Sequence, residues 1–291
     1  MSMFSFYQHI PQYLDPIIFS IGSFAIRWYS LMYVAGILTA FFLLRWRIGK
    51  GEAPQDFKIS NSKTEKSGEL GITLDILLVG FWGMLFGGRL GYILFYNFPY
   101  YLQNPVEALL PVAVSGDGLR ITGYYGLSYH GALLGVIASG YVFSKIRKLD
   151  FWRVADFVAP AAAGAYFFGR IGNFLNGELW GRETNSFLGM YFGEDFFLRH
   201  PSQLYEAFLE GLVLFLLLWI IRNKGRFDGQ VFLVYIVGYA FFRYVSEYFR
   251  SPDWQSGLIL GIFSTGQLLS LCMLAGGSLL YFQKNRKNAI I

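Results

Sequence analysis

Seven windows of about twenty predominantly apolar residues constrain the fold of this chain more than any other feature. They lie at 24–44, 72–95, 129–145, 154–174, 203–221, 230–248 and 259–282. A helix of this length crosses the hydrocarbon core of a bilayer, whereas barrel strands would show alternation over about ten residues. The pattern predicts an all-α polytopic membrane protein with about seven transmembrane helices.

Composition supports the same class of protein. Of the 291 residues, 54% are hydrophobic and only 15% are charged, which is too apolar for a soluble domain of this size. The net charge of +5 comes without a basic block or a nucleic-acid motif, so no nucleic-acid partner is predicted. The single cysteine, Cys272, excludes an internal disulfide and a cysteine-based zinc site.

The distribution of lysine and arginine predicts the orientation. Sixteen of the 24 basic residues, including all nine lysines, fall in four segments, 45–66, 145–153, 222–226 and 284–287. Basic residues are enriched in cytoplasmic loops, so we expect these segments to be cytoplasmic. An odd number of spans then places the N-terminus outside and the C-terminus inside.

The intervening segments complete the predicted organisation. The polar stretch 49–70 is the best candidate for a flexible loop. The outer loops, about 97–128 and 175–202, are expected to form a small periplasmic cap. Residues 1–291 would form a single integral-membrane catalytic domain.

The eight basic residues outside those four segments are all arginines, and every one lies in the outer half of a span or in an outer loop. A guanidinium grips phosphate or carboxylate through paired hydrogen bonds, which an ammonium cannot reproduce. We infer an anion site that faces outward. The alternative is snorkelling of single arginines to lipid phosphates.

The stretch FGRIGNFLNGELWGRE, residues 168–183, carries the densest polar group. Arg170 and Asn173 are three residues apart, so a helix puts them on one face, and Glu178 follows where Gly177 ends the helix. A charge inside a span costs about 2.5–3.5 kcal/mol on insertion scales, which favours a functional site. The alternative is a polar cluster that only joins helices.

Two further arginines stand inside apolar windows. Arg243 and Glu247 are four residues apart in YAFFRYVSEYFRSPD, which predicts an ion pair on one helical face. Arg89 follows two glycines in GGRLGYILFYN, where a neighbouring helix can approach closely. The alternative for the pair is a purely structural role.

His130, in YYGLSYHGALLGV, begins the third window and is the natural candidate for a general base. The alternative is a hydrogen-bonded anchor at the membrane interface. Tyr29, in RWYSLMYVAG, and Tyr239 are candidates for hydrogen bonds to a lipid ester, although an aromatic belt explains most tyrosines in such a chain.

Together these motifs resemble those of the bacterial prolipoprotein diacylglyceryl transferase family. FGRIGNFLNGELWGR, GGRLGYILFYNF, YHGALLGV, RHPSQLYE and FRYVSEYFRSPD occur in the family's order, and RWYSLMYVAG extends the match over nearly the whole chain. The resemblance implies a seven-helix enzyme of the bacterial inner membrane whose site opens to the periplasm. The matching residues are Tyr29, His130, Arg170, Asn173, Glu178, Gly181, Tyr239, Arg243 and Glu247.

The resemblance also implies a reaction. A diacylglyceryl group moves from phosphatidylglycerol, a membrane lipid, to the thiol of the lipobox cysteine in a preprolipoprotein signal peptide, and glycerol phosphate is released. Arg170 and Arg243 would hold the phosphate, Glu247 would orient Arg243, and His130 would take the thiol proton. Asn173, Glu178, Gly181, Tyr29, Tyr239 and Arg89 would bind the substrate. Neither a cofactor nor a metal is expected.

Two other classes of function compete with this reading. A transporter for an anionic lipid or solute would use the same arginines, but transporters usually show internal repeats and polar residues at mid-membrane, which this sequence lacks. A non-catalytic lipid-binding scaffold would explain the arginines but not His130. Product formation by the purified protein distinguishes these classes from an enzyme.

Overall fold

The structure is a computed structural model. It describes residues 3–22, 24–54, 57, 65–96, 98–109, 112–115, 118–121, 128–251, 258–259 and 263–290. The chain divides into two compact units, which are described separately. The major unit comprises residues 1–53 and 155–291, and the minor unit comprises residues 54–154.

The seven apolar windows fall mainly on helices. These are α2 (Trp28–Gly49), α3 (Glu65–Tyr96), α6 (Tyr129–Arg147), α7 (Phe151–Leu175), the continuous run α8 (Ser202–Glu206), η1 (Ala207–Val213) and α9 (Leu214–Ile221), α10 (Gln230–Ser246), and α11 (Thr265–Ile290). In the described part of the chain, four helical stretches are both long and apolar enough to cross a membrane, namely Trp28–Gly49, Gly68–Leu94, Ser202–Ile221 and Thr265–Ala289. The chain is therefore mostly helical and of the multi-span membrane type, and the number seven stays a prediction.

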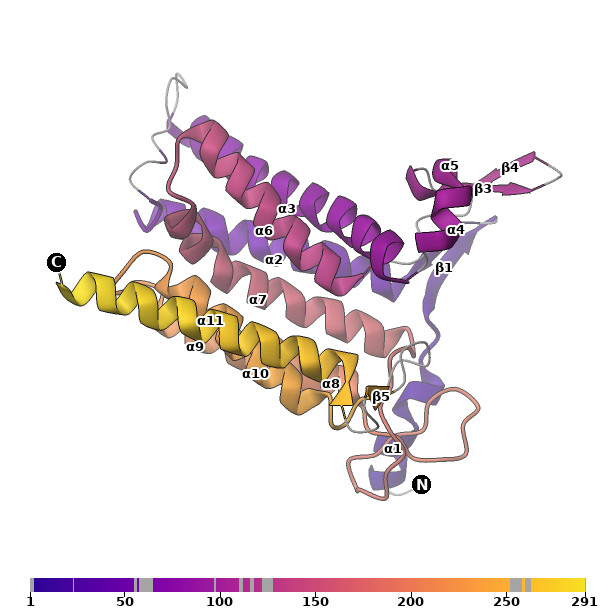
Figure 1. Cartoon of the computed structure of the whole chain (residues 1–291). Helices are drawn as coiled ribbons and strands as arrows, with labels where there is room; N and C mark the ends of the chain where they lie inside the picture. Colours follow the sequence, from indigo (N-terminus) through magenta and orange to yellow (C-terminus); the bar gives the residue numbers. More distant parts are fainter. Residues whose placement is uncertain are drawn as a thin grey trace. The chain divides into compact units, whose positions relative to one another are not determined.

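In the minor unit, α3 and α6 lie side by side (Figure 1). Glycines set their separation: a Cβ atom added to Gly87 would lie 2.4 Å from the carbonyl oxygen of Gly131, and one added to Gly135 would lie 2.7 Å from the Cα of Gly87. Small residues let helix backbones approach closely in membrane proteins. The unit also contains α4 (Phe98–Gln103), α5 (Pro105–Leu109) and the hairpin β3 (Val112–Ser115) and β4 (Gly118–Ile121).

In the major unit, α10 packs against α11, and the two ends of the helices differ (Figure 1). At one end Glu52 pairs with Arg47 at 2.9 Å and with Arg222 at 3.1 Å, and Lys284 donates to the carbonyl of Asp228 at 2.6 Å. Three of the predicted basic segments therefore meet at one end. The other end carries α1 (Met3–Tyr13) and the segment 176–201.

The structure corrects two window boundaries and adds short strands that the all-α expectation omitted. The window 24–44 begins in β2 (Phe24–Arg27), which pairs with β1 (Ile17–Ile21) across a turn where Gly22 has φ +60°. The window 259–282 begins in the pair β5 (Leu258–Ile259) and β6 (Phe263–Ser264), and its helix starts only at Thr265.

A capping box explains where that last helix begins. Gln267 N–H donates to Ser264 Oγ at 3.1 Å, and Ser264 N–H donates to Gln267 Oε1 at 3.0 Å. This reciprocal pair satisfies two backbone donors at the start of α11. Of the predicted flexible loop 49–70, residues 55–56 and 58–64 lie outside the described residues, and the last part of the range is helical because α3 already begins at Glu65.

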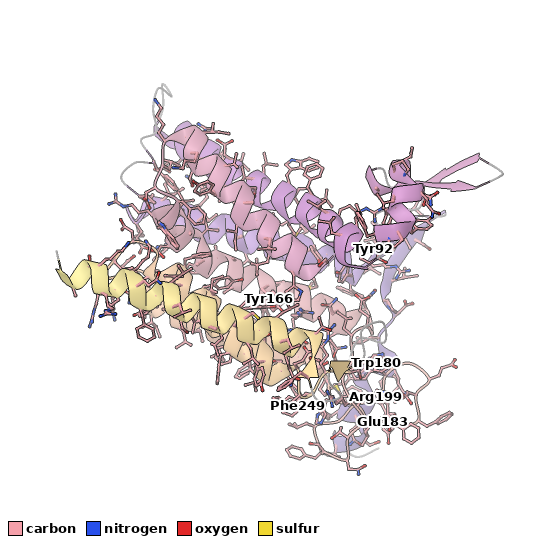
Figure 2. All side chains as sticks on the ribbon, viewed as in Figure 1. Tyr92, Tyr166, Trp180, Glu183, Arg199 and Phe249 are labelled. Atoms are coloured by element: carbon pink, nitrogen blue, oxygen red, sulfur yellow. The ribbon has the colours of Figure 1, made fainter. Side chains whose placement is uncertain are left out.

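The segment 176–201 contains no helix but has a small core of its own. Phe174, Met190 and Phe192 are buried together, and Tyr7 and Ile10 of α1 pack against them. The Arg199 guanidinium lies 4.3 Å above the Trp180 ring and 3.2 Å from the Glu183 carboxylate, and Phe249 lies at the same end of the unit (Figure 2).

Candidate functional site

The site is built first on the last turns of α7. Tyr166, Arg170 and Asn173 follow one another at helical spacing, so they share one face. Arg170 Nε donates to the Tyr166 hydroxyl at 2.7 Å, and Arg170 Nη1 lies 3.4 Å from Asn173 Oδ1. The predicted common face of Arg170 and Asn173 is confirmed.

The chain turns back directly after this helix. Gly177 has φ +67°, a left-handed conformation that suits glycine, and the chain leaves the direction of α7 at this residue. The turn brings Glu178 back to α7, where its Oε1 accepts from Asn173 Nδ2 at 3.0 Å. Asn173 is buried, so this bond fixes both side chains.

The second part of the site is the ion pair at the end of α10. Arg243 Nη2 lies 2.6 Å from Glu247 Oε2, which confirms the predicted contact. The other carboxylate oxygen of Glu247 accepts from Ser264 Oγ at 3.0 Å. A Cβ atom added to Gly266 would lie 2.8 Å from this carboxylate, so it sits directly against the first turn of α11, where the helix dipole favours an anion.

A residue that sequence reasoning missed connects these two parts. Glu206, the last residue of α8, is only 1% exposed, and its Oε2 lies 2.9 Å from Arg170 Nε while its Oε1 lies 2.9 Å from Arg243 Nη1. Arg250 Nη1 lies 3.4 Å from the same Oε1. Three guanidiniums therefore converge on one buried carboxylate. We call Arg170, Arg243, Arg250 and Glu206 the arginine cluster.

A second missed carboxyl group lies close to the arginine cluster. Glu210, in the π-helix η1, is fully buried, and its Oε2 accepts from the Tyr166 hydroxyl at 2.6 Å. The signal for both residues was present in RHPSQLYEAFLEG, where two acids four residues apart stand in an apolar window. The insertion cost that singled out Arg170 applies equally to them.

Tyr239 and Tyr29 border the site from two other helices. Tyr239 of α10 is buried, and its ring lies 5.6 Å from the Tyr166 ring in an edge-to-face arrangement. A Cβ atom added to Gly172 would lie 3.3 Å from Tyr29 Cδ2, so α2 packs on α7 beside Asn173. The Tyr29 hydroxyl lies 3.0 Å from that of Tyr33.

Close packing of neighbouring backbone leaves no room for a side chain at Gly181. A Cβ atom there would lie 2.3 Å from the carbonyl oxygen of Phe249 and 2.7 Å from that of His200. Gly181 forms a β-bridge with Arg250, and Arg182 Nε donates to the Arg250 carbonyl at 2.9 Å. The glycine thus allows the chain that carries Arg250 to lie where its side chain reaches Glu206.

His200 packs against aromatic side chains at this end of the unit. Its ring packs edge-to-face on Phe249 at 5.1 Å, and its Nδ1 lies 3.2 Å from the Tyr205 hydroxyl. Burial lowers the pKa of His200 below its ordinary 6.5. The neutral imidazole is therefore the form that this packing accommodates.

The other two predicted site residues belong to the minor unit. His130 is half-buried in the first turn of α6, next to Ser128, which caps that helix by accepting from Gly131 N–H at 3.3 Å. Arg89 of α3 donates through Nε to the carbonyl of Ala108 at 3.1 Å and through Nη2 to the carbonyl of Glu107. Its guanidinium also lies 4.9 Å from the centre of the Tyr101 ring. These contacts attach α5 and α4 to α3.

The described residues contain no group of three or more His, Cys, Asp or Glu side chains arranged to hold a metal ion. Both Glu206, inside the arginine cluster, and Glu247, beside it, pair with guanidiniums. The arrangement is suited to holding an anion beside several guanidiniums in a water-poor environment.

Fold and site together define a class: a multi-span helical membrane protein with a buried arginine cluster at one end of its helices. The chain belongs to the prolipoprotein diacylglyceryl transferase family, whose model matches residues 16–283.

Relatives named phosphatidylglycerol–prolipoprotein diacylglyceryl transferase are similar over nearly the full length. That of Chlorobaculum tepidum is 42% identical over 97% of this chain and 94% of its own. That of Pseudoalteromonas translucida is 44% identical over 95% of this chain and 97% of its own.

Proposed function

We propose that this chain is a phosphatidylglycerol–prolipoprotein diacylglyceryl transferase. It moves the diacylglyceryl group of phosphatidylglycerol to the thiol of the lipobox cysteine in a preprolipoprotein signal peptide, forming a thioether and releasing glycerol phosphate. Family membership supports the reaction. The observation that carries it in the structure is the convergence of Arg170, Arg243 and Arg250 on Glu206.

The arginine cluster binds the phosphate of the lipid. A guanidinium has five N–H donors, and Arg170 uses only Nε and Nη1 in the contacts described above, which leaves Nη2 for a phosphate oxygen. Glu247 holds Arg243 from the other side, so little reorganisation is needed when charge develops on the leaving phosphate. Both arginines act by stabilising that charge as the carbon–oxygen bond breaks.

The remaining roles follow the chemistry of the thiol and the glycerol. A cysteine thiol has a pKa of about 8.5, so it needs a base at neutral pH, and His130 is the candidate. Asn173, Glu178 and Tyr29 lie around the end of α7 and position the glycerol backbone by hydrogen bonds. Tyr239, Gly181 and Arg89 contribute to substrate binding through the elements that they hold in place.

The protein resides in the bacterial inner membrane with seven spans, its N-terminus outside and its C-terminus in the cytoplasm. Three basic segments meet at one end of the major unit, and the arginine cluster lies toward the other end, which also carries the segment 176–201 (Figure 1). This separation and the positive-inside tendency support a site that faces the periplasm. The outer loops, about 97–128 and 175–202, would then lie on the periplasmic side as a small cap.

Incubation of the purified protein in detergent with phosphatidylglycerol and a lipobox peptide tests the function. The expected result is a gain in peptide mass equal to one diacylglyceryl group. A peptide with serine in place of the cysteine and a reaction without the lipid are the controls. A folded protein that leaves the peptide unchanged, yet moves an anion across proteoliposomes, would favour the transporter instead.

A further inference from the structure

Glu210 is a buried acid to which the proposed mechanism assigns no role. Its side chain is 0% exposed, and among the described residues it forms no ion pair, whereas Glu206, four residues earlier, faces three arginines. An ionised carboxylate that is buried without a counter-ion is far more costly than a neutral carboxylic acid. Its surroundings therefore favour the protonated form.

The hydrogen bonds of Glu210 lead to the arginine cluster. Arg170 Nε donates to the Tyr166 hydroxyl at 2.7 Å, and a guanidinium can only donate. The Tyr166 hydroxyl must then direct its own proton to Glu210 Oε2, 2.6 Å away. Arg170 also lies over the Tyr166 ring, 4.9 Å from its centre. Glu210 thus holds Tyr166, and Tyr166 holds Arg170.

The local fold places Glu210 against α7. It lies in the seven-residue π-helix Ala207–Val213, a rare conformation that often marks functional sites. A Cβ atom added to the next residue, Gly211, would lie 2.7 Å from the Cα of Phe167. The glycine lets the widened turn lie directly on α7, next to Tyr166.

The charge of the site depends on Glu210. The charged and titratable groups near it are Glu206 on its own helical run, Tyr166 and Arg170 on α7, and Tyr235, Tyr239 and Arg243 on α10. The three arginines of the cluster face two paired carboxylates, Glu206 and Glu247. A neutral Glu210 leaves one excess positive charge, and an ionised Glu210 leaves none.

We propose that Glu210 is a positioning residue of the phosphate site, which stays a neutral carboxylic acid, holds Arg170 through Tyr166, and leaves one excess positive charge for a phosphodiester anion. The inference rests on the proposed transferase function, and it deepens the account of how that site selects phosphatidylglycerol, whose phosphodiester carries one negative charge. No proton is transferred to the substrate in this role.

Three variants of the full-length protein test the proposal. Glu210→Ala should lower kcat/KM for phosphatidylglycerol at least about tenfold, because the chain of hydrogen bonds that begins at Arg170 loses its last acceptor. Glu210→Gln should rescue most of this loss, since the amide is neutral and still accepts from Tyr166. Tyr166→Phe keeps the ring below Arg170 but removes the hydroxyl, and it should resemble Glu210→Ala.

The pH profile separates the charge of Glu210 from a merely structural role. The parent's KM for phosphatidylglycerol should rise once the pH is high enough to ionise Glu210, whereas Glu210→Gln should hold its KM constant over the same pH range. Equal losses in the Gln and Ala variants, both folded by thermal unfolding, would overturn the proposal. So would a Gln variant whose KM follows the parent's pH dependence.

Direct binding of a fluorescent phosphatidylglycerol distinguishes this failure from failure of the transferase function. If the parent binds the lipid but never modifies the peptide, the transferase function fails. The affinity of the lipid for the parent and for Glu210→Gln, measured across the same pH range, then still tests the charge of Glu210. An affinity that depends on pH in the parent alone supports the proposal. The same pH dependence in both proteins refutes it.

Discussion

Glu206→Gln is the change that most directly tests how the arginine cluster is held. The substitution keeps the shape of the side chain and removes the negative charge that lies 2.9 Å from both Arg170 Nε and Arg243 Nη1. Glu206 is 1% exposed, so water cannot replace the lost charge. The three guanidiniums would then repel one another without a shared partner.

The magnitude follows from the burial of these pairs. Removing one partner of a buried ion pair costs about 3–5 kcal/mol, because the charges that remain are left unpaired. The amide oxygen of glutamine still accepts one hydrogen bond, so we take the lower value, about 3 kcal/mol. At about 1.4 kcal/mol for each factor of ten, the same amount lost from transition-state stabilisation corresponds to roughly a hundredfold lower activity.

The loss should appear in kcat and not in KM for phosphatidylglycerol. The variant site is more positive, so it attracts the anionic lipid at least as well, but its arginines no longer keep the orientation that stabilises the leaving phosphate. The assay is steady-state transfer to a lipobox peptide, followed by mass spectrometry, at several lipid concentrations.

The matched control is Glu194→Gln, a change of the same chemistry at an exposed glutamate in the segment 176–201, which should leave both constants within about twofold of the parent's. A folded Glu206→Gln protein with kcat within threefold of the parent would refute the view that Glu206 holds the cluster. A large rise in KM would instead mean that Glu206 contacts the substrate.

Four further outcomes are expected. Arg243→Lys should lose at least tenfold in kcat/KM, because one ammonium cannot reach Glu206, Glu247 and a phosphate together; nearly full activity would exclude paired contacts. A membrane-impermeant thiol reagent should label a cysteine placed at Asn185, which is exposed, but not one placed at Ser62, and the reverse pattern would invert the topology. His130→Ala should lower transfer about 10²–10⁴-fold at neutral pH while lipid binding persists, and the defect should shrink as pH approaches the thiol pKa; a defect that is constant with pH would make His130 a positioning residue. Because burial depresses the pKa of His200 in the folded state, its contribution to stability is complete above pH 6.5 and is lost as pH falls from 6.5 through the lower folded-state pKa, so the melting temperature should fall less below pH 6.5 in His200→Gln than in the parent.

The helical architecture was predictable because a bilayer imposes one length scale on every span. The windows fell mainly on helices, and three of the four basic segments that were assigned to one side meet in the major unit through Glu52 and Lys284. Two of the short strands escaped prediction because β2 and β6 lie inside apolar windows whose residues suit either a strand or a membrane helix.

The contacts within one helix were also predictable, and those between helices were not. Spacing alone placed Arg170 beside Asn173 and Arg243 beside Glu247. Nothing in the spacing shows that a single carboxylate from α8 reaches arginines on α7 and α10. The π-helix that carries Glu210 was not predicted, because no residue pattern in AFLEGLV distinguishes it from an α-helix.

The arginine cluster is assembled before any lipid arrives, and this explains why it contains carboxylates at all. Three unpaired guanidiniums buried side by side would repel one another at a large cost, whereas Glu206 and Glu247 cancel most of that charge and fix the orientation of the donors. Full cancellation would leave nothing to attract a phosphodiester. A large excess of positive charge would retain the product glycerol phosphate, because its phosphate monoester carries more negative charge than the phosphodiester of the substrate. A net charge near +1 therefore binds the substrate without trapping the product, and it requires that one further carboxyl group beside the arginines, Glu210, stay neutral.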